Sequence, residues 1–157
     1  MKRRLSTGKQ VVLGLALLLV VLVVSGLMIF YYALYPYRSA RKDVEALVKQ
    51  HMALSEVNQF AIFHHQESYY SLKAKGERGE SLLILVPQAG ETILVYHETE
   101  GISASHAEEV AKASGATSIQ KTTFGLLDQV PIWEVVADGT YYYIRFKEGD
   151  LVSGEGL

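Results

Sequence analysis

The chain carries VVLGLALLLVVLVVSGLMIFYYALY at residues 11–35, a run without a charged side chain. A helix rises about 1.5 Å per residue, so this run is long enough to cross a hydrocarbon core about 30 Å thick, and a helix satisfies its own backbone hydrogen bonds there. Tyrosines gather at the far end of the run, where amphipathic rings prefer the headgroup layer of a membrane. They are Tyr31, Tyr32, Tyr35 and Tyr37. The run therefore predicts a transmembrane helix over residues 11–35.

Charged residues on either side of the run predict its direction. Residues 1–10 carry four basic side chains and no acidic one, whereas residues 38–45 mix three basic side chains with two acidic ones. Since the cytoplasmic flank of a membrane helix carries the excess of Lys and Arg, we expect a cytoplasmic tail at 1–10, a single pass, and an extracellular domain from about Arg38 onward. A cleaved secretory signal is the alternative, but its apolar core usually has about 7–15 residues and ends in a small-x-small site. The longer run here, which ends in YYALYP, favours an uncleaved anchor.

The composition of the exterior part limits the partners it can have. Residues 36–157 contain 11 basic and 17 acidic side chains, a net charge of −6, and the chain has no cysteine. Phosphate backbones are bound by basic faces, so we expect no nucleic-acid partner. Without cysteine the domain has neither disulfides nor thiolate metal sites.

Hydrophobic periodicity in residues 40–100 predicts one helix followed by four strands. From Ala40 the apolar residues fall on one side of a 3.6-residue period, which indicates an amphipathic helix that either continues the membrane helix past Pro36 or starts afresh after a kink. Aromatic and β-branched residues then dominate short segments separated by polar connections, a pattern typical of an antiparallel meander. The expected strands are Val57–Gln66, Ser68–Lys75, Ser81–Pro87 and Thr92–His97. We expect Leu82–Val86 in a central strand, because this segment is entirely apolar.

The second half repeats this order. Ser105 and Glu108 form a capping-box pattern, so a helix is expected over Ser105–Ser114. Strand-like segments follow, with Asp138-Gly139 as a tight turn between two of them. The expected strands are Ser118–Leu127, Ile132–Ala137 and Thr140–Lys147, the last with Thr140, Tyr142, Ile144 and Phe146 facing the core, and a final edge near Leu151.

Both halves read as a helix followed by strands, which predicts a duplicated unit. The expected fold class is α+β, with an N-terminal transmembrane helix followed by two units, each one helix packed on an antiparallel sheet. The expected domains are a first unit over residues 36–100 and a second over residues 101–157. About 120 residues suffice for two such small units that share a core.

No arrangement of residues predicts catalysis, a cofactor or a metal. His64 and His65 are adjacent, so in a strand they point to opposite faces and cannot bind one ion together. His106 and Glu109 stand at helical i, i+3 spacing, but a single pair at a helix start is typical of solvated surface. The chain also lacks a Gly-x-Ser-x-Gly elbow and a phosphate-binding glycine loop. We expect no enzyme activity, no cofactor and no small-molecule substrate.

Aromatic residues on the predicted strands are the candidates for contact with a partner. Tyr and Trp are enriched in interface hot spots, although core packing explains about half of such rings in this chain. The alternation of the strand at Thr140–Lys147 assigns Tyr142 to the core and its neighbours to the outward face. The partner-binding candidates are Tyr69, Trp133, Tyr141 and Tyr143.

Several motifs together resemble known bacterial families. The second half contains Ile102-Ser103 with Ala107 and Ala111, then Trp133–Gly139, Tyr143-Ile144 and Gly149–Val152. In these residues it is similar to a PepSY repeat, a small helix-and-sheet module of secreted bacterial proteins. The anchor, the short linker and the paired units resemble the TseB family, also called YpmB-like, of single-pass membrane proteins in Gram-positive bacteria.

The resemblance implies cystatin- or PepSY-like units and a role in regulating side-wall elongation at the cell membrane. The partner that it implies is a class B penicillin-binding protein, the transpeptidase that crosslinks peptidoglycan. Two other binding functions stay open. One is a PepSY-like protease inhibitor or chaperone-like module, and the other is a peptidoglycan or small-ligand binder whose rings stack on sugars.

Overall fold

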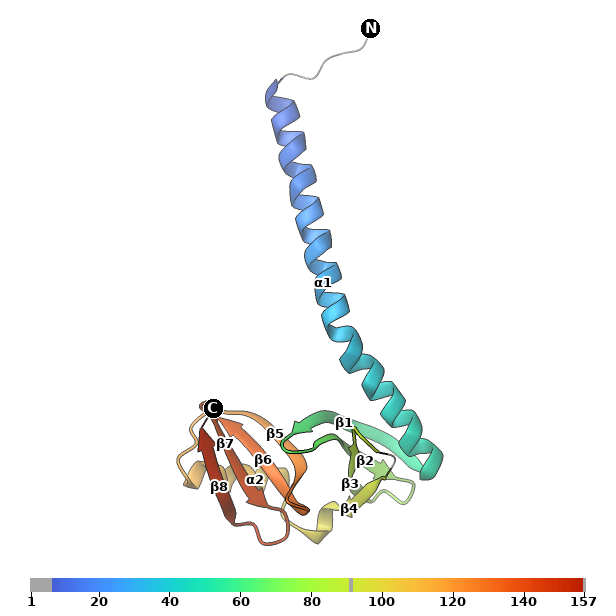
Figure 1. Ribbon diagram of the computed structural model, residues 1–157, viewed down its shortest axis with the longest axis vertical. Coiled ribbons are helices and arrows are strands. Elements are labelled where there is room, and N and C mark those ends of the chain that lie inside the picture. The colour runs from blue at the N-terminus through green and yellow to red at the C-terminus, as the bar shows by residue number, and fades with distance from the viewer. Residues whose placement is uncertain (1–6, 91, 157) are drawn as a thin grey trace. The chain divides into compact units, whose positions relative to one another are not determined.

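The computed structural model describes residues 7–90 and 92–156, drawn in Figure 1. By its internal contacts the chain divides into two compact units, residues 1–43 and 44–157. Residues 1–6 of the predicted cytoplasmic tail lie outside the described residues.

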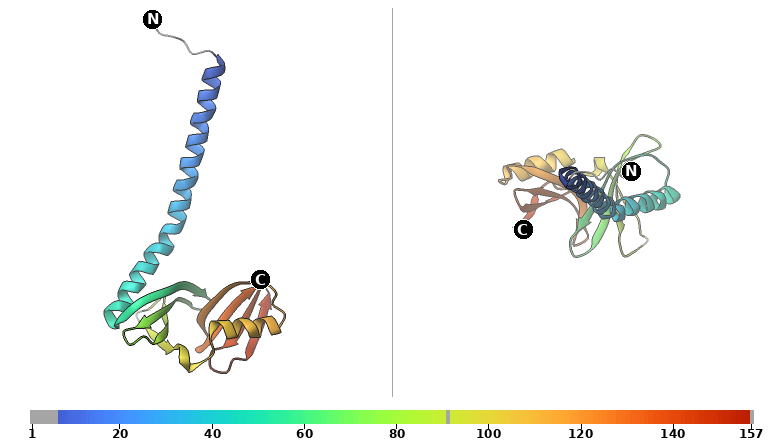
Figure 2. Two further views of the ribbon diagram at one scale, coloured as in Figure 1. Left: turned by 180° about the vertical axis from the view of Figure 1, so that it is seen from behind. Right: turned by 90° about the horizontal axis from the view of Figure 1, so that it is seen from above.

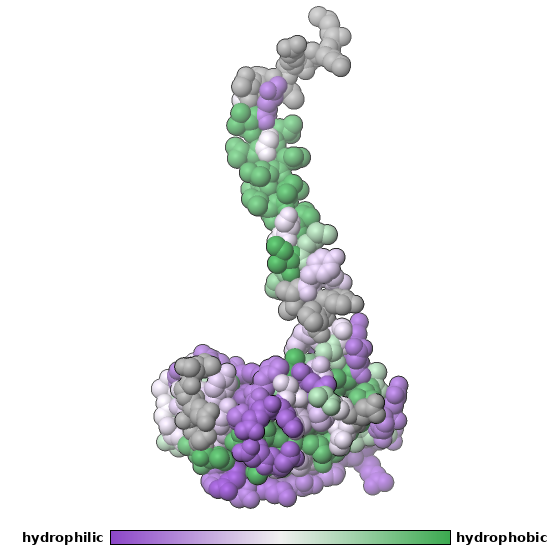
Figure 3. Space-filling model, viewed as in Figure 1, coloured by the Kyte–Doolittle hydropathy of each residue, from purple (hydrophilic) through white to green (hydrophobic). Residues whose placement is uncertain are grey.

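The first unit consists of most of helix α1, which spans Thr7–His51. Every described residue from Gly8 to Tyr32 is exposed, although most of them are apolar. Figure 3 shows apolar residues over much of the visible face of this helix. By length and composition, α1 is able to cross a membrane. Of the two alternatives for the segment after Pro36, the structure has the continuous helix.

The second unit begins with the end of α1, where Val44 and Val48 are buried, and continues into the first sheet. This sheet contains β1 (Leu54–His64), β2 (Ser68–Gly76), β3 (Ser81–Pro87) and β4 (Leu94–His97). Its strands pair antiparallel in the order β1-β2-β3-β4, so the predicted meander is confirmed. Leu82–Val86 is buried throughout in the interior strand β3, as its unbroken apolar run predicts.

A short 3₁₀ helix, η1 (Glu98–Glu100), leads to helix α2 (Ala104–Ala113) and to the second sheet. This sheet pairs β5 (Ile119–Leu127), β6 (Val130–Ala137), β7 (Thr140–Arg145) and β8 (Leu151–Gly156) in that order, all antiparallel. The predicted capping residue of α2 is wrong. Ser103 rather than Ser105 is the N-cap, because the Ser103 hydroxyl accepts a hydrogen bond from the backbone of His106. The tight turn at Asp138-Gly139 is confirmed by φ angles of 54° and 74°.

Helix α2 covers one face of the second sheet (Figure 2). Residues paired across antiparallel strands share a face, which puts Phe124, Trp133 and Ile144 in one buried row. The indole N–H of Trp133 donates to the carbonyl of Ile102, just before α2, at 2.9 Å. This bond fixes the start of the helix against the middle of the sheet.

The first sheet contacts the second at β5, and the end of β1 lies on the face of β5 opposite α2. The central row of this face contains Thr123, Glu134 and Tyr143, all of them buried. Phe63 at the end of β1 packs here so closely that a Cβ added to Gly125 would lie 2.5 Å from its ring. One cluster of buried side chains contains residues from both sheets, so the two sheets share a core.

The buried carboxyl group of Glu134 predicts a pH-dependent stability. Burial raises the pKa of Glu134 above its ordinary value, and the charge of Lys121 opposes this. The folded protein therefore holds the carboxyl proton more tightly than the unfolded chain does, so the ionised form destabilises the fold at neutral pH. That penalty disappears as the pH falls through the raised pKa toward the ordinary one. We expect Glu134→Gln to raise the melting temperature near pH 7, with the gain vanishing by about pH 4.

Calorimetry at a series of pH values measures this gain. Glu77→Gln is the matched control, because Glu77 is an exposed carboxylate and should give no gain at any pH. A gain of the same size across the whole series would assign the effect of Glu134→Gln to packing instead of ionisation.

Candidate functional site between two hairpin turns

Three of the four predicted partner-binding aromatics are buried. Tyr69 and Trp133 are each 4% exposed, and Tyr143 is 6% exposed. The prediction of an outward Tyr143 is wrong, because the ring of His65, in the turn between β1 and β2, stacks on it. Tyr141 is partly buried, as is Tyr142, which was assigned to the core. Binding of a partner by these residues stays a prediction.

The side chain that covers Tyr143 is His65. The two rings stack with their centroids 5.7 Å apart and an interplanar angle of 12°, and Tyr143 lies parallel to Tyr141 at 6.3 Å. The adjacent His64 contacts the Ser68 hydroxyl instead, at 2.8 Å, so the two histidines have different partners. Within residues 7–90 and 92–156, no group of three or more potential metal ligands occurs.

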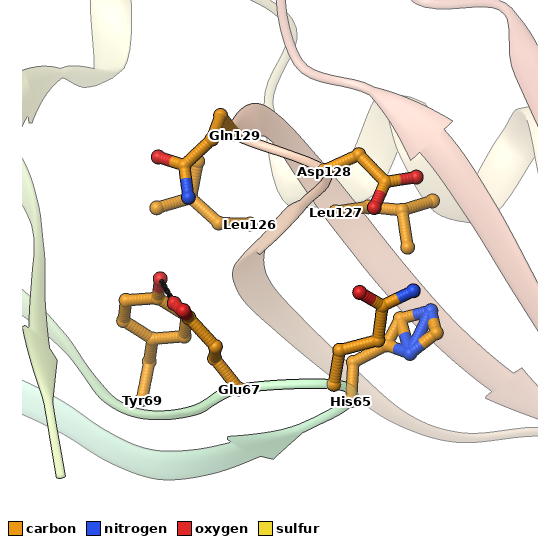
Figure 4. Close-up of a pocket in the computed structure, with 8 residues that line it drawn as sticks. His65, Glu67, Tyr69, Leu126, Leu127, Asp128 and Gln129 are labelled. Atoms are coloured by element: carbon orange, nitrogen blue, oxygen red, sulfur yellow. Dashed lines mark hydrogen bonds between the residues drawn. The ribbon is translucent and has the colours of Figure 1, made fainter. Parts of the chain in front are cut away.

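A polar pocket of about 260 Å³ lies where the turn between β1 and β2 meets the turn between β5 and β6 (Figure 4). Figure 4 shows Glu67 and Tyr69 on one side, with Asp128 and Gln129 across from them. The residues that line the pocket are His65, Gln66, Glu67, Tyr69, Leu126, Leu127, Asp128 and Gln129. Segments far apart in the sequence thus form its two walls.

Backbone hydrogen bonds hold the first wall at the start of β2. The N–H of His65 donates to the carbonyl of Glu67 at 3.2 Å, and the N–H of Gln88 donates to the carbonyl of Ser68 at 2.9 Å. The hydroxyl of the buried Tyr69 donates to the Glu67 carboxylate. This hydrogen bond raises the pKa of Tyr69, and burial adds to the effect. The Tyr69 hydroxyl therefore stays protonated and holds the Glu67 carboxylate beside the pocket.

The second wall is the two-residue turn of the β5–β6 hairpin. Asp128 and Gln129 have φ angles of 49° and 67°, the left-handed pair that a type I′ turn requires. Glycine is the usual residue at such positions, yet both positions here carry polar side chains. The sequence does not predict this turn, since Asp-Gln lacks the glycine that marks a hairpin. The sign of a turn in the sequence is Asp128, an acidic residue directly after the apolar end of the strand at Leu127.

The chemistry of the lining residues suits reversible binding of a cation. Glu67 and Asp128 supply two carboxylates, and the lining contains neither Lys nor Arg. It also contains no serine, threonine or cysteine that could act as a nucleophile. A pocket with acceptors on both walls favours a ligand group that donates hydrogen bonds and carries positive charge.

Comparisons with known proteins bear on the family and the fold. A family model described as a cell wall elongation regulator TseB-like domain matches residues 45–87, which contain the end of α1 and strands β1 to β3. The YpmB protein from Bacillus subtilis has a similar structure, with a TM-score of 0.64 and 24% identity over 74% of this chain and 96% of that chain. A putative lipoprotein from Clostridium difficile 630 aligns with a TM-score of 0.41 and 10% identity over 77% of this chain and 92% of that chain. No curated protein sequence matches the chain.

Proposed function

We propose that the chain is TseB-like, as its sequence predicted, and that it is a membrane-anchored, non-enzymatic regulator of cell wall elongation. In this proposal it acts by binding a class B penicillin-binding protein. The observation that carries the proposal is the match of residues 45–87 to a domain described as a regulator of cell wall elongation. The similar fold of the YpmB protein is consistent with it. The apolar helix α1 supports the anchor.

In the proposed topology, residues 1–10 are cytoplasmic, residues 11–35 cross the membrane and the C-terminal domain is extracellular. The four basic side chains of the first ten residues support this direction. Residues 36–100 and 101–157 are proposed as two cystatin- or PepSY-like units. The same order of one helix and four antiparallel strands in both halves supports this division.

Anchoring also explains how a small domain without catalytic machinery can act on an enzyme. A transpeptidase with its own membrane helix is confined to the same plane, so each protein meets the other at a raised effective concentration. A modest exterior interface is then sufficient for stable association. Contact with the transpeptidase, rather than chemistry on a substrate, is the proposed mode of regulation.

Affinity capture from cells tests the proposal. The full-length protein is crosslinked mildly in cells, extracted from the membrane and captured, and its companions are identified by mass spectrometry. We expect a class B penicillin-binding protein to be enriched about tenfold or more over a control chain that ends after residue 43, because the interface lies in the exterior domain.

Other companions would contradict the proposal. Recovery of an extracellular protease in place of the penicillin-binding protein would favour the inhibitor function, and recovery of wall fragments would favour a peptidoglycan binder. Equal recovery of the penicillin-binding protein with the truncated chain would assign the contact to the membrane helix and refute an exterior interface.

A further inference from the structure

The pocket between the two hairpin turns indicates which kind of side chain the partner presents to this protein. We propose that this pocket binds one basic side chain, a lysine or an arginine, on the surface of the protein partner. The identity of the partner rests on the proposed function. The chemistry of the contact rests on the pocket itself.

The size of the pocket favours a single side chain. Its volume of about 260 Å³ is smaller than the roughly 300–1,000 Å³ of typical small-molecule sites. The residues at the tips of both turns are exposed, so the surface of another protein can reach them. These residues are His65, Gln66, Glu67, Asp128 and Gln129.

The charges of the two carboxylates are not balanced by a basic side chain among the described residues. In the part of the chain that the structure describes, no lysine or arginine pairs with Glu67 or Asp128. One oxygen of Glu67 is engaged by the Tyr69 hydroxyl, which leaves its second oxygen for a ligand. Lysine and arginine side chains carry several donors and no acceptor, and they match such a site.

The remaining lining fits the stem of the same side chain. Leu126 and Leu127 line the pocket with apolar groups, against which the methylene stem of a lysine or arginine can pack. The rings of Tyr69 and His65 also line the pocket, and the ring of a tyrosine attracts a nearby cation. Apolar, aromatic and acidic groups therefore converge on one small volume.

The charge of the exterior domain points to the same class of partner surface. Residues 36–157 carry a net charge of −6, so a basic surface is attracted to them before contact. Charge complementarity of this kind favours a protein surface with Lys or Arg over a neutral or acidic one.

Charge-neutral substitutions on both walls test the inference. Glu67→Gln keeps an acceptor for the Tyr69 hydroxyl, and Asp128→Asn suits a positive φ because asparagine adopts it readily. In the capture experiment, the double variant should recover the partner at least about tenfold less than the wild-type chain, because truncation of one half of a charge pair weakens binding. Its melting temperature should match that of the wild-type chain.

The matched control is the double variant Glu77→Gln/Glu148→Gln. It changes the net charge by the same amount at two exposed carboxylates that do not line the pocket. Normal recovery with the control and reduced recovery with the pocket variant would support the inference. Equal recovery of the partner by all three chains would overturn the inference. An equal loss with both variants would also overturn it, because the loss would then come from the net charge and not from the pocket.

A titration with a defined probe separates failure of this inference from failure of the proposed function. Nα-acetyl-lysine N-methylamide is added to the full-length protein in detergent micelles, and backbone amide shifts are followed by NMR. Shifts confined to residues 65–69 and 126–129, absent with the Nε-acetylated probe, would support the pocket even if no penicillin-binding protein is captured. Identical shifts with both probes, or none at these residues, would overturn it even if the penicillin-binding protein is captured.

Discussion

Replacement of Trp133 by alanine is expected to lower the free energy of unfolding by about 3–5 kcal/mol. The indole is 4% exposed, packs on Phe124 with the ring centroids 5.2 Å apart, and donates to the Ile102 carbonyl. Alanine leaves a cavity between the second sheet and α2, and it leaves that carbonyl without its donor. For a unit of this size the melting temperature should fall by more than about 10 °C. Calorimetry of the full-length protein measures the change.

Val130→Ala is the matched control for Trp133→Ala. Val130 lies on the same strand, β6, but is 41% exposed, so its truncation should change stability by less than about 1 kcal/mol. If Trp133→Ala left the melting temperature unchanged and abolished capture of the partner, the indole would be an interface residue as the sequence suggested. A large fall in melting temperature would assign it to the core.

Replacement of Gly101 by alanine is expected to destabilise the protein by about 3 kcal/mol, at the upper end of the range for overpacking. A Cβ at this position would lie 2.2 Å from the carbonyl oxygen of Phe146. The clash is with backbone, so no side-chain rotation relieves it. The neighbouring hydrogen bond, from the N–H of Ile102 to the same Phe146 carbonyl at 2.7 Å, must then lengthen or break. Chemical denaturation measures the change.

Gly90→Ala provides the control for this substitution. A Cβ at Gly90 would meet only the Cβ of Pro87, at an ordinary 3.8 Å, so the change in stability should stay within about 0.5 kcal/mol. Equal stability of the two variants would show that the segment at Gly101 can move away from Phe146.

The fold was predictable where the local signal determines the structure. The unbroken apolar segment Leu82–Val86 is too short for a typical helix and fits a strand in the interior of a sheet. Asp138-Gly139 supplies the left-handed residues of a hairpin turn. The start of α2 was not predictable in this way, because Ser103 and Ser105 are both capping residues. The choice between them follows from Ile102, which is held in place by the Phe146 carbonyl, directly after β7, and by the Trp133 indole on β6.

The candidate site was less predictable, because it depends on contacts between distant segments. Strand alternation predicts that Tyr142 and Tyr143 face opposite sides of the sheet, but it does not predict which of the two sides another segment covers. His65, far away in the sequence, covers Tyr143, and so both sides are occupied. The pocket also needs two turns to meet, and neither Glu67 nor Asp128 indicates the other in the sequence.

The core shared by the two sheets has a consequence for the order in which the chain is made. Strands β1 to β4 leave the ribosome first, and Phe63, Leu83 and Leu85 then present an apolar face whose partners are still being synthesised. A nascent chain in this state is prone to aggregation until β5 arrives with Phe124. The C-terminal half therefore acts as a folding partner of the N-terminal half. A truncated chain that lacks β5 would leave the same apolar face exposed.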